Sequence, residues 1–281
     1  MGLLLLIIIL QTYSIEESGS FYSQAGKVNY NNYAPDWVYL DARPAPKWYD
    51  SGKIGIFVHW GPYAVPCYSS EWFWFELENG DEKVKNFMAA NKYDSYLEFP
   101  SMFTAELFEP DKWAKLFADA GARYVVFTSK HHDGFALFPS GRSNWNSVDV
   151  GPKRDIVGAL SESIRKHNMK FGLYYSLYEW FNKLYRDDRK RDYTTTNYTD
   201  TIVWPDIKYL INEYKPSVLW SDGDREASCT YWKSREMLAW IYNESPVRDE
   251  IVVNDRWGHD SWCKHGDFYN CDDGFNPGKD T

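Results

Sequence analysis

The feature that most limits the fold of this chain is a regular alternation of short apolar runs with amphipathic segments. Runs rich in β-branched and aromatic residues occupy 53–59, 124–128, 171–176, 218–221 and 251–254. Apolar residues recur at helical spacing in the segments 111–120, 155–167, 205–214 and 231–242. Continuously apolar strands that alternate with helices are typical of parallel βαβ units covered on both faces. The sequence therefore predicts an α/β fold with a parallel sheet.

Polar side chains recur where the apolar runs end. They are His59, His131, His132, Asp133, Tyr174, Asp222, Asp255 and Arg256. The carboxyl ends of parallel strands form the ligand-binding edge of both (β/α)8 barrels and doubly wound sheets. No glycine-rich nucleotide-binding motif follows any strand, which favours the barrel and predicts no cofactor. Because five strands are fewer than a closed barrel needs, we expect a (β/α)8 TIM-like barrel that is incomplete at the C-terminus.

Charge and aromatic content narrow the class of ligand. The formal net charge of the chain is −9, whereas a nucleic-acid-binding protein needs a basic face. Aromatic residues make up 19% of the chain, and many fall in predicted loops rather than at periodic core positions. These observations exclude nucleic acid as a partner and favour a carbohydrate ligand.

The N-terminal segment predicts entry into the secretory pathway. Residues 3–10 form an unbroken apolar run that is too short to span a bilayer but suits a signal peptide. We expect a signal peptide over 1–20 and a mature domain over 21–281 with no membrane span. Two sequons predict N-glycans at Asn197 and Asn243. In an oxidising compartment, Cys263 and Cys271 are candidates for a disulfide.

Asp222 is the main candidate for a reacting carboxylate. It lies one step beyond an apolar strand, directly before Gly223, and Trp220 beside it could stack on a sugar. Glycoside hydrolysis needs a second carboxyl group that donates a proton to the leaving oxygen. The candidates for that group are Glu71, Asp133, Glu179, Asp255, Asp272 and Asp273. We favour Asp273, because the like charge of Asp272 raises a neighbouring pKa, whereas Arg256 is expected to neutralise Asp255.

Three histidines near the strand ends raise the question of a metal site. Adjacent residues of a strand project to opposite faces, so His131 and His132 could bind one ion only across a bulge. The chain has neither an HExxH motif nor paired CxxC motifs. We therefore predict no metal, and we expect His59 and the histidine pair to bind hydroxyl groups. The charged stretch 186–192 is expected to be a solvated loop.

Six motifs, in one order along the chain, are similar to those of the retaining α-L-fucosidases of the lysosomal and tissue type. They are FVHWG at 57–61, SEWFW at 70–74, KHHDGF at 130–135, GLYYS at 172–176, LWSDG at 219–223 and VNDRWG at 253–258. The resemblance implies a glycoside hydrolase catalytic domain that cleaves terminal α-L-fucose from glycans or glycoproteins with retention of configuration. It implies a lysosomal or extracellular location.

The same resemblance implies roles for individual residues. Asp222 corresponds to the nucleophile, and Asp273 lies where the animal enzymes carry the acid/base. In bacterial relatives the donor is a Glu whose alignment with Asp272 or Asp273 is ambiguous. The residues implied to form the fucose pocket are His59, Glu71, Trp72, His131, His132, Tyr174, Trp220 and Arg256. Trp72, Phe73, Trp74 and Phe135 are expected to form an apolar wall for the methyl group of fucose.

The chain also departs from the family. Members of the family continue beyond the equivalent of Thr281, completing the barrel and adding a C-terminal β-sandwich. We therefore expect a truncated chain with a partial barrel. Two functions stay open: an active α-L-fucosidase, and a catalytically inert homologue that binds fucose. Homo-oligomerisation stays open as well.

Overall fold

Five parallel strands form the centre of the molecule. The computed structural model describes residues 32–271 and 273, and its sheet has the order β1-β2-β3-β4-β5 with every neighbouring pair parallel. The strands are β1 (Gly55–Val58), β2 (Tyr124–Lys130), β3 (Lys170–Ser176), β4 (Val218–Asp222) and β5 (Val252–Val253). A doubly wound sheet reverses its strand order at a switch point, whereas a barrel adds each strand beside the last. The order therefore confirms the predicted barrel type of α/β fold, and the sheet of the described residues is open.

Helices connect the strands as the sequence predicts. The main connecting helices are α6 (Pro110–Asp119), α7 (Ile156–Lys166), α9 (Trp204–Tyr214) and α11 (Ser234–Asn243). The side chain of Asp155 caps α7 by accepting a hydrogen bond from the N–H of Gly158 at 2.8 Å. Gly121 follows α6 with a φ of 86°, a left-handed conformation that glycine adopts readily after a helix.

The two faces of the sheet carry separate apolar clusters. On one face, strand side chains such as Val125, Leu173 and Leu219 pack with the connecting helices. The other face, which we call the inner face, carries a smaller aromatic-rich cluster. Its buried members are Tyr49, Phe57, Tyr124, Val126, Tyr174, Val218, Trp220 and Val252. Because successive strand side chains alternate between faces, the residues two positions beyond these members also face inward.

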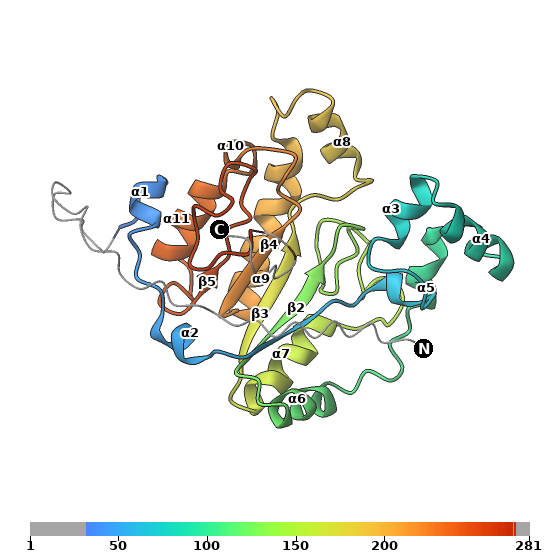
Figure 1. Ribbon diagram of the computed structural model, residues 1–281, viewed down its shortest axis with the longest axis horizontal. Coiled ribbons are helices and arrows are strands. Elements are labelled where there is room, and N and C mark those ends of the chain that lie inside the picture. The colour runs from blue at the N-terminus through green and yellow to red at the C-terminus, as the bar shows by residue number, and fades with distance from the viewer. Residues whose placement is uncertain (1–31, 272, 274–281) are drawn as a thin grey trace, which may run out of the picture.

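Further helices surround the carboxyl edge of the sheet. In Figure 1 a helical segment formed by α3 (Phe73–Glu78), α4 (Glu82–Asn91) and α5 (Phe99–Met102) lies to one side of the strands, and α8 (Lys183–Arg189) lies above them. Two short helices, α1 (Trp37–Leu40) and α2 (Lys47–Ser51), precede β1. Single turns occur at η1 (Pro62–Ala64) and η2 (Tyr96–Glu98), and η3 (Thr199–Val203) is a π-helical turn before α9. None of the described helices has the length and apolar character needed to cross a membrane.

The predicted helix over 231–242 is wrong in one respect, because the structure divides it. Helix α10 (Cys229–Trp232) ends at Lys233, whose φ of 53° is left-handed, and α11 begins at Ser234. The indole of Trp232 donates to the carbonyl of Asp224, and the hydroxyl of Ser234 donates to the carbonyl of Trp257. These buried contacts on either side of Lys233 override the helical periodicity of the sequence.

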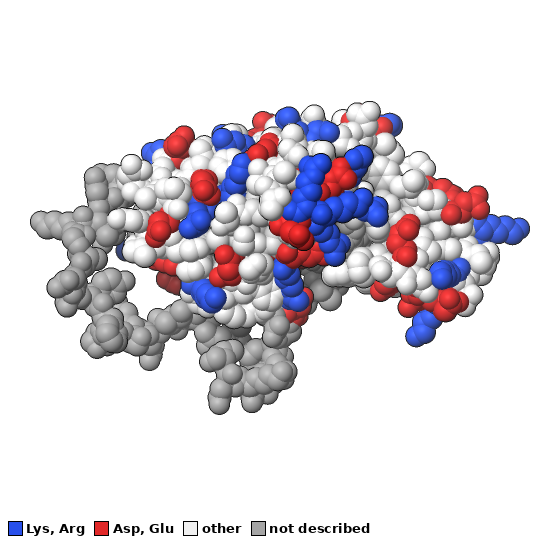
Figure 2. All heavy atoms as spheres, turned by 90° about the horizontal axis from the view of Figure 1, so that it is seen from above, with Lys and Arg blue, Asp and Glu red and all other residues white. Residues whose placement is uncertain are grey.

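The interpretation of 186–192 as a solvated loop is also wrong. Residues up to Arg189 belong to α8, and Asp188 is completely buried. Its carboxylate accepts hydrogen bonds from the hydroxyls of Thr195 and Tyr231 and from the N–H of Tyr198. The basic side chains of this segment are nevertheless exposed. Figure 2, in which the molecule of Figure 1 is seen from above, shows Lys and Arg side chains gathered on that face.

Candidate active site

The candidate active site lies at the carboxyl edge of the inner face. Tyr174 and Trp220 are opposite each other in the register of β3 and β4, and Asp222 follows Trp220 by two residues on the same face. His59 follows β1, two residues after the inner-face residue Phe57. The alternation of strand side chains thus brings residues from different parts of the sequence to one place, as their positions at strand ends predicted.

Both carboxylate oxygens of Asp222 accept hydrogen bonds. The hydroxyl of Tyr174 donates to Oδ2 at 2.8 Å, and Nη1 of Arg256 donates to Oδ1 at 2.8 Å. The Nε2 atom of His132 lies 3.5 Å from Oδ2. The carboxylate is therefore fixed in orientation by residues from β3 and from the segment after β5.

The surroundings of Asp222 keep it ionised. Burial alone would raise its pKa, but the charge of His132, which is protonated only at low pH, the charge of Arg256 and the hydrogen bonds from Tyr174 and Arg256 lower the pKa to about 2. Burial lowers the pKa of His132 to about 4. His132 is therefore neutral at neutral pH, and Arg256 is the cation that remains beside the carboxylate.

Hydroxyl groups set the tautomers of two site histidines. The hydroxyl of Thr128 donates to the carbonyl of Val58, so it accepts from Nδ1 of His59 at 2.8 Å. The hydroxyl of Ser176 likewise donates to the carbonyl of Tyr178 and accepts from Nδ1 of His132 at 2.7 Å. Each neutral histidine is left with an unprotonated Nε2, which can accept a hydrogen bond from a ligand hydroxyl.

The histidine pair enters the site through an irregularity in β2. The register between β2 and β3 shifts between Thr128 and Lys130, directly before the pair. The ring of His131 stacks on Tyr174 with centroids 5.4 Å apart, and the rings of His131 and His132 are 4.2 Å apart. Burial lowers the pKa of His131 well below its usual range, and its Nδ1 has no hydrogen-bond partner among the described residues.

Arg256 connects Asp222 with the segment that carries Asp273. Its Nη2 donates to the carbonyl of Asn270 at 3.1 Å and pairs with Oδ1 of Asp273. The expectation that Arg256 neutralises Asp255 is therefore wrong. The two carboxylates of Asp222 and Asp273 outweigh the effect of burial and raise the pKa of Arg256 above its usual range.

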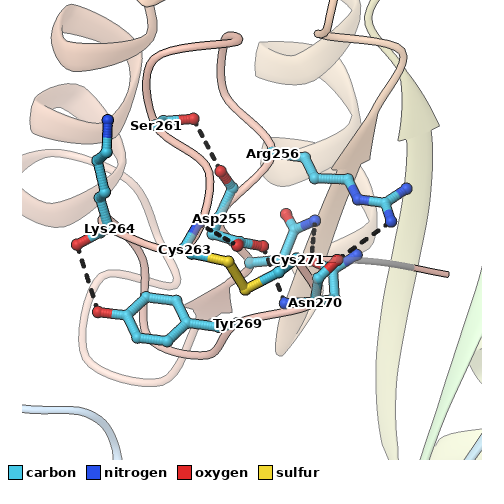
Figure 3. The surroundings of a disulfide bond; sticks show 9 residues. Asp255, Arg256, Ser261, Cys263, Lys264, Tyr269, Asn270 and Cys271 are labelled. Carbon is cyan, nitrogen blue, oxygen red and sulfur yellow. Dashed lines mark hydrogen bonds between the residues drawn. A yellow bond between two sulfur atoms is a disulfide. The ribbon is translucent and has the colours of Figure 1, made fainter. Parts of the chain in front are cut away.

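A disulfide closes the loop that precedes Asp273. Cys263 and Cys271 are joined, with their Cα atoms 5.3 Å apart. Asp255 is completely buried beside this bond, and its carboxylate accepts from the N–H groups of Cys263 at 2.8 Å and Asn270 at 3.0 Å (Figure 3). Asp255 therefore holds both ends of the loop, an arrangement that leaves it no role as a proton donor.

Two other predicted donors have structural partners. Asp133 is buried and accepts from the hydroxyl of Tyr96 at 2.7 Å and from the N–H of Phe135 at 3.1 Å. Glu179 forms an ion pair with the buried Lys130 at 2.7 Å. Asp272 lies outside the described residues, so Glu71 and Asp273 are the predicted donors that the structure leaves near Asp222.

Glu71 has the electrostatic surroundings expected of an acid. Burial raises its pKa, and the negative charges of Glu76, Asp273 and Asp222 raise it further. Its neighbour Trp72 is 38% exposed, and the Trp72 ring lies 5.3 Å from that of His132. Trp72 therefore borders the site, and Glu71 lies close enough for the charges of Asp222 and Asp273 to raise its pKa.

Trp220 lies beside the site, on the inner face opposite Tyr174 and two residues before Asp222, and its ring packs against Phe57 and Phe268. Some aromatic residues predicted for the methyl-binding wall belong to the core instead. Phe73 and Phe135 are buried in the cluster of the opposite face. Their place in the predicted methyl-binding wall is therefore wrong, because the loop and helix that carry them turn these side chains toward the interior.

The described residues contain one cluster with the spacing of metal ligands, formed by Asp255, Cys263 and Cys271. Its two sulfurs are bonded to each other, so neither is available as a thiolate. The three site histidines do not form such a cluster in the part of the chain that the structure describes.

Sequence reasoning missed the loop between β3 and α8. Tyr178 stacks on His132 with ring centroids 4.6 Å apart, and Trp180 lies 5.3 Å from the same ring. The signal was present, since this loop directly follows a strand end and contains Tyr178, Trp180 and Phe181. Thr128 and Ser176 were also missed, although their positions at the ends of β2 and β3 place them beside the site.

Comparisons with known proteins show the family of this chain. The family model described as alpha-L-fucosidase matches residues 20–281. The tissue alpha-L-fucosidase of Rattus norvegicus is 50% identical over 259 residues, which cover 91% of this chain and 56% of the rat protein. The Homo sapiens tissue enzyme is also 50% identical, over 87% of this chain and 53% of its own length. This chain thus spans about half the length of these relatives.

Solved structures give the same result. The alpha-fucosidase of Thermotoga maritima is 34% identical, with a TM-score of 0.70 over 80% of this chain and 56% of its own. An alpha-L-fucosynthase from the same organism, in complex with alpha-L-Fuc-(1-2)-beta-L-Fuc-N3, has a TM-score of 0.73 and 33% identity over 85% and 59% of the two chains. With a family model that matches nearly the whole chain and an inner-face site built from the six motifs, the protein belongs to the alpha-L-fucosidase family.

Proposed function

We propose that the protein hydrolyses terminal α-L-fucose from glycans and glycoproteins by a retaining, double-displacement mechanism. The observation that carries this proposal is the environment of Asp222. Its carboxylate is held ionised and oriented by Arg256 and Tyr174, and it lies beside histidines that can accept hydrogen bonds from sugar hydroxyls. This is the state that a nucleophile needs.

In the first step, an oxygen of Asp222 attacks the anomeric carbon while the bond from that carbon to the leaving oxygen breaks. A carboxylic acid protonates the leaving oxygen, and a glycosyl-enzyme ester forms. In the second step, the same residue, now a carboxylate, takes a proton from water as the water attacks the anomeric carbon. Fucose leaves with its original configuration, and Asp222 is regenerated.

We assign the acid/base role to Asp273, with Glu71 as its rival. A retaining enzyme needs its two carboxyl groups about 5–5.5 Å apart, and one guanidinium, that of Arg256, contacts both Asp222 and Asp273. Glu71 has a raised pKa, which suits the acid of the first step.

The product formed with azide separates these roles. Asp222→Gly should abolish turnover of an aryl α-L-fucoside, and added azide should then attack from the vacated face to give β-L-fucosyl azide. Asp273→Gly should still form the glycosyl-enzyme from an activated fucoside, so azide should give α-L-fucosyl azide. The anomer is read by NMR. An Asp222→Gly variant with full activity would overturn the assignment of the nucleophile.

The same measurement tests the alternative proton donor and the alternative function. If Glu71 is the proton donor, Glu71→Gln should give the α-azide and Asp273→Gly should retain activity on a natural fucoside. If the wild-type protein binds fucose but cleaves neither natural nor activated fucosides, it is the inert homologue rather than an enzyme.

We propose that the protein enters the secretory pathway and acts in the lysosome or outside the cell. The predicted signal peptide over 1–20 lies outside the described residues. The side chain of Asn197 is exposed, whereas Nδ2 of Asn243 donates to the carbonyls of Tyr33 and Ala239. A glycan on Asn243 would replace one of the two N–H donors of Nδ2 and so break at least one of these hydrogen bonds, and we therefore expect modification at Asn197. Intact mass before and after enzymatic removal of N-glycans checks this, and Asn197→Gln should remove the mass difference.

A further inference from the structure

Three aromatic side chains form a continuous, partly exposed surface beside the candidate active site. They are Trp72, Phe75 and Trp180, and we call them the aromatic platform. The ring of Trp180 lies 5.2 Å from that of Trp72 and 5.3 Å from that of Phe75, and the rings of Trp72 and Phe75 are 5.4 Å apart. Two segments far apart in the sequence, one at the start of α3 and one between β3 and α8, therefore meet here.

The platform is exposed although its rings are large and apolar. Trp72 and Phe75 are each 38% exposed, whereas the adjacent site residue His132 is 3% exposed. Contiguous exposed apolar surface in a soluble protein marks a binding site more often than chance exposure does. The platform touches the site through His132, whose ring is 5.3 Å from both Trp72 and Trp180.

Buried polar contacts hold Trp180 in place. The N–H of Trp180 donates to the carbonyl of His132 at 2.9 Å. The preceding residue, Glu179, turns inward and pairs with Lys130, whose side chain is 1% exposed and also donates to the hydroxyl of Tyr175 at 3.0 Å. Gly134 allows this approach, because a Cβ there would lie 2.8 Å from Oε2 of Glu179. A surface fixed by such contacts loses little conformational entropy when a ligand binds.

We propose that the aromatic platform, through Phe75 and Trp180, binds the sugar ring to which fucose is attached, that is, the pyranose that leaves in the first step of the reaction. This inference rests on the proposed function, since it takes fucose to lie against Asp222 and His132. The leaving sugar, which is linked to the anomeric carbon of fucose, must then lie outside the group of buried site residues. The platform begins at that point. The C–H face of a pyranose suits an aromatic ring, whose face is electron-rich.

Two substrates with different leaving groups test the proposal. The disaccharide Fucα(1,6)GlcNAc carries a pyranose leaving group, and α-L-fucosyl fluoride carries none. Phe75→Ala and Trp180→Ala should each lower the ratio of kcat/KM for the disaccharide to kcat/KM for the fluoride by about 10-fold, mainly through KM. Tyr39→Ala, at an exposed tyrosine of α1 outside the site, is the control and should leave both values unchanged. An unchanged ratio in both platform variants would overturn the proposal.

A binding measurement separates this proposal from the proposed function. Calorimetry in the Asp222→Gly background, where turnover is blocked, compares the affinity for the disaccharide with that for fucose. The platform predicts that the disaccharide binds more tightly and that Trp180→Ala removes the difference. If the wild-type protein fails to cleave the fluoride, the proposed function is wrong. The difference in affinity between the disaccharide and fucose would still show whether the platform binds the second sugar. Equal affinities for the disaccharide and fucose would exclude it.

Discussion

At the scale of single residues, the site depends on how each oxygen and nitrogen is oriented. Asp222 has one hydrogen bond to each oxygen, from Tyr174 and Arg256, and the two neighbouring histidines are fixed by hydroxyl groups of Thr128 and Ser176. A ligand would therefore meet acceptors already in place and would not have to reorganise them. Such preorganisation is the main way in which a folded site stabilises a charged transition state.

Tyr174→Phe tests this orientation directly. Loss of the hydroxyl removes one hydrogen bond to a charged group, a change of about 1.5–3 kcal/mol. Because this hydrogen bond helps to lower the pKa of Asp222 to about 2, the acidic limb of the pH profile for kcat/KM should move to higher pH, and kcat/KM should fall by about 10-fold or more. Tyr175→Phe is the matched control. Tyr175 bonds Asp206 on the opposite face of β3, so its variant should keep the acidic limb of the wild type.

At the scale of secondary-structure elements, the fold was largely predictable and the site only in part. All five strands and the four main connecting helices were predicted, because strands buried on both faces are continuously apolar and their helices are amphipathic. The division at Lys233 and the burial of Asp188 depend on contacts with distant residues, which periodicity does not contain. For the same reason Phe73 was expected beside a ligand, although it packs into the core.

The contacts of charged side chains were the least predictable part. Sequence adjacency suggested that Arg256 pairs with Asp255, but both residues lie in the irregular segment after β5, and their side chains take different partners. Arg256 reaches Asp222 and Asp273, while Asp255 turns toward the N–H groups of the disulfide loop. No local sequence pattern indicates which partners the side chains of Arg256 and Asp255 contact. By contrast, Asp222 was predictable because its place, directly after an apolar run and before a glycine, is itself a local pattern.

The ion pair of Lys130 and Glu179 links two elements and gives a prediction at this scale. Glu179→Gln leaves the charge of Lys130 buried without its partner, which should reduce the free energy of unfolding by about 3–5 kcal/mol. Lys130→Met in the same chain removes the buried charge and should restore part of this loss. Denaturant unfolding of the two single variants and the double variant gives the coupling. Purely additive effects would show that the pair does not fix the loop between β3 and α8.

At the scale of the whole molecule, buried carboxyl groups and buried histidines have opposite effects on how stability changes with pH. Burial raises the pKa to about 6 in four carboxyl groups, those of Asp133, Asp206, Asp224 and Asp267. Burial lowers the pKa of His59 and His132 to about 4, and that of His131 well below its usual value. As pH falls from about 6 to 4, the folded state takes up more protons at these carboxyls, and the unfolded state takes up more at the histidines.

These opposite contributions predict a stability that changes little over the acidic range. Each carboxyl with a raised pKa stabilises the folded state as pH falls, and each buried histidine destabilises it, by up to about 1.4 kcal/mol per pH unit. With four such carboxyls against three histidines, most of the effect cancels. Urea unfolding at pH 7, 6, 5 and 4 should therefore show a shallow dependence on pH. A steep loss of stability between pH 6 and 5 would mean that the histidines outweigh the carboxyls.

Replacing one of these buried carboxyl groups should change the pH dependence of stability in a known direction. Asp206 is buried, accepts from the hydroxyls of Ser140 and Tyr175, and has its pKa raised to about 6. Asp206→Asn cannot gain the stability that protonation of Asp206 gives the wild type, so the stability of the variant relative to wild type should be greatest at pH 7 and fall by about 1–3 kcal/mol toward pH 4. Asp94→Asn, at an exposed position, is the surface control, measured over the same range. If the Asp206→Asn difference were constant, Asp206 would be ionised throughout, and the cancellation would have to come from the other three carboxyls.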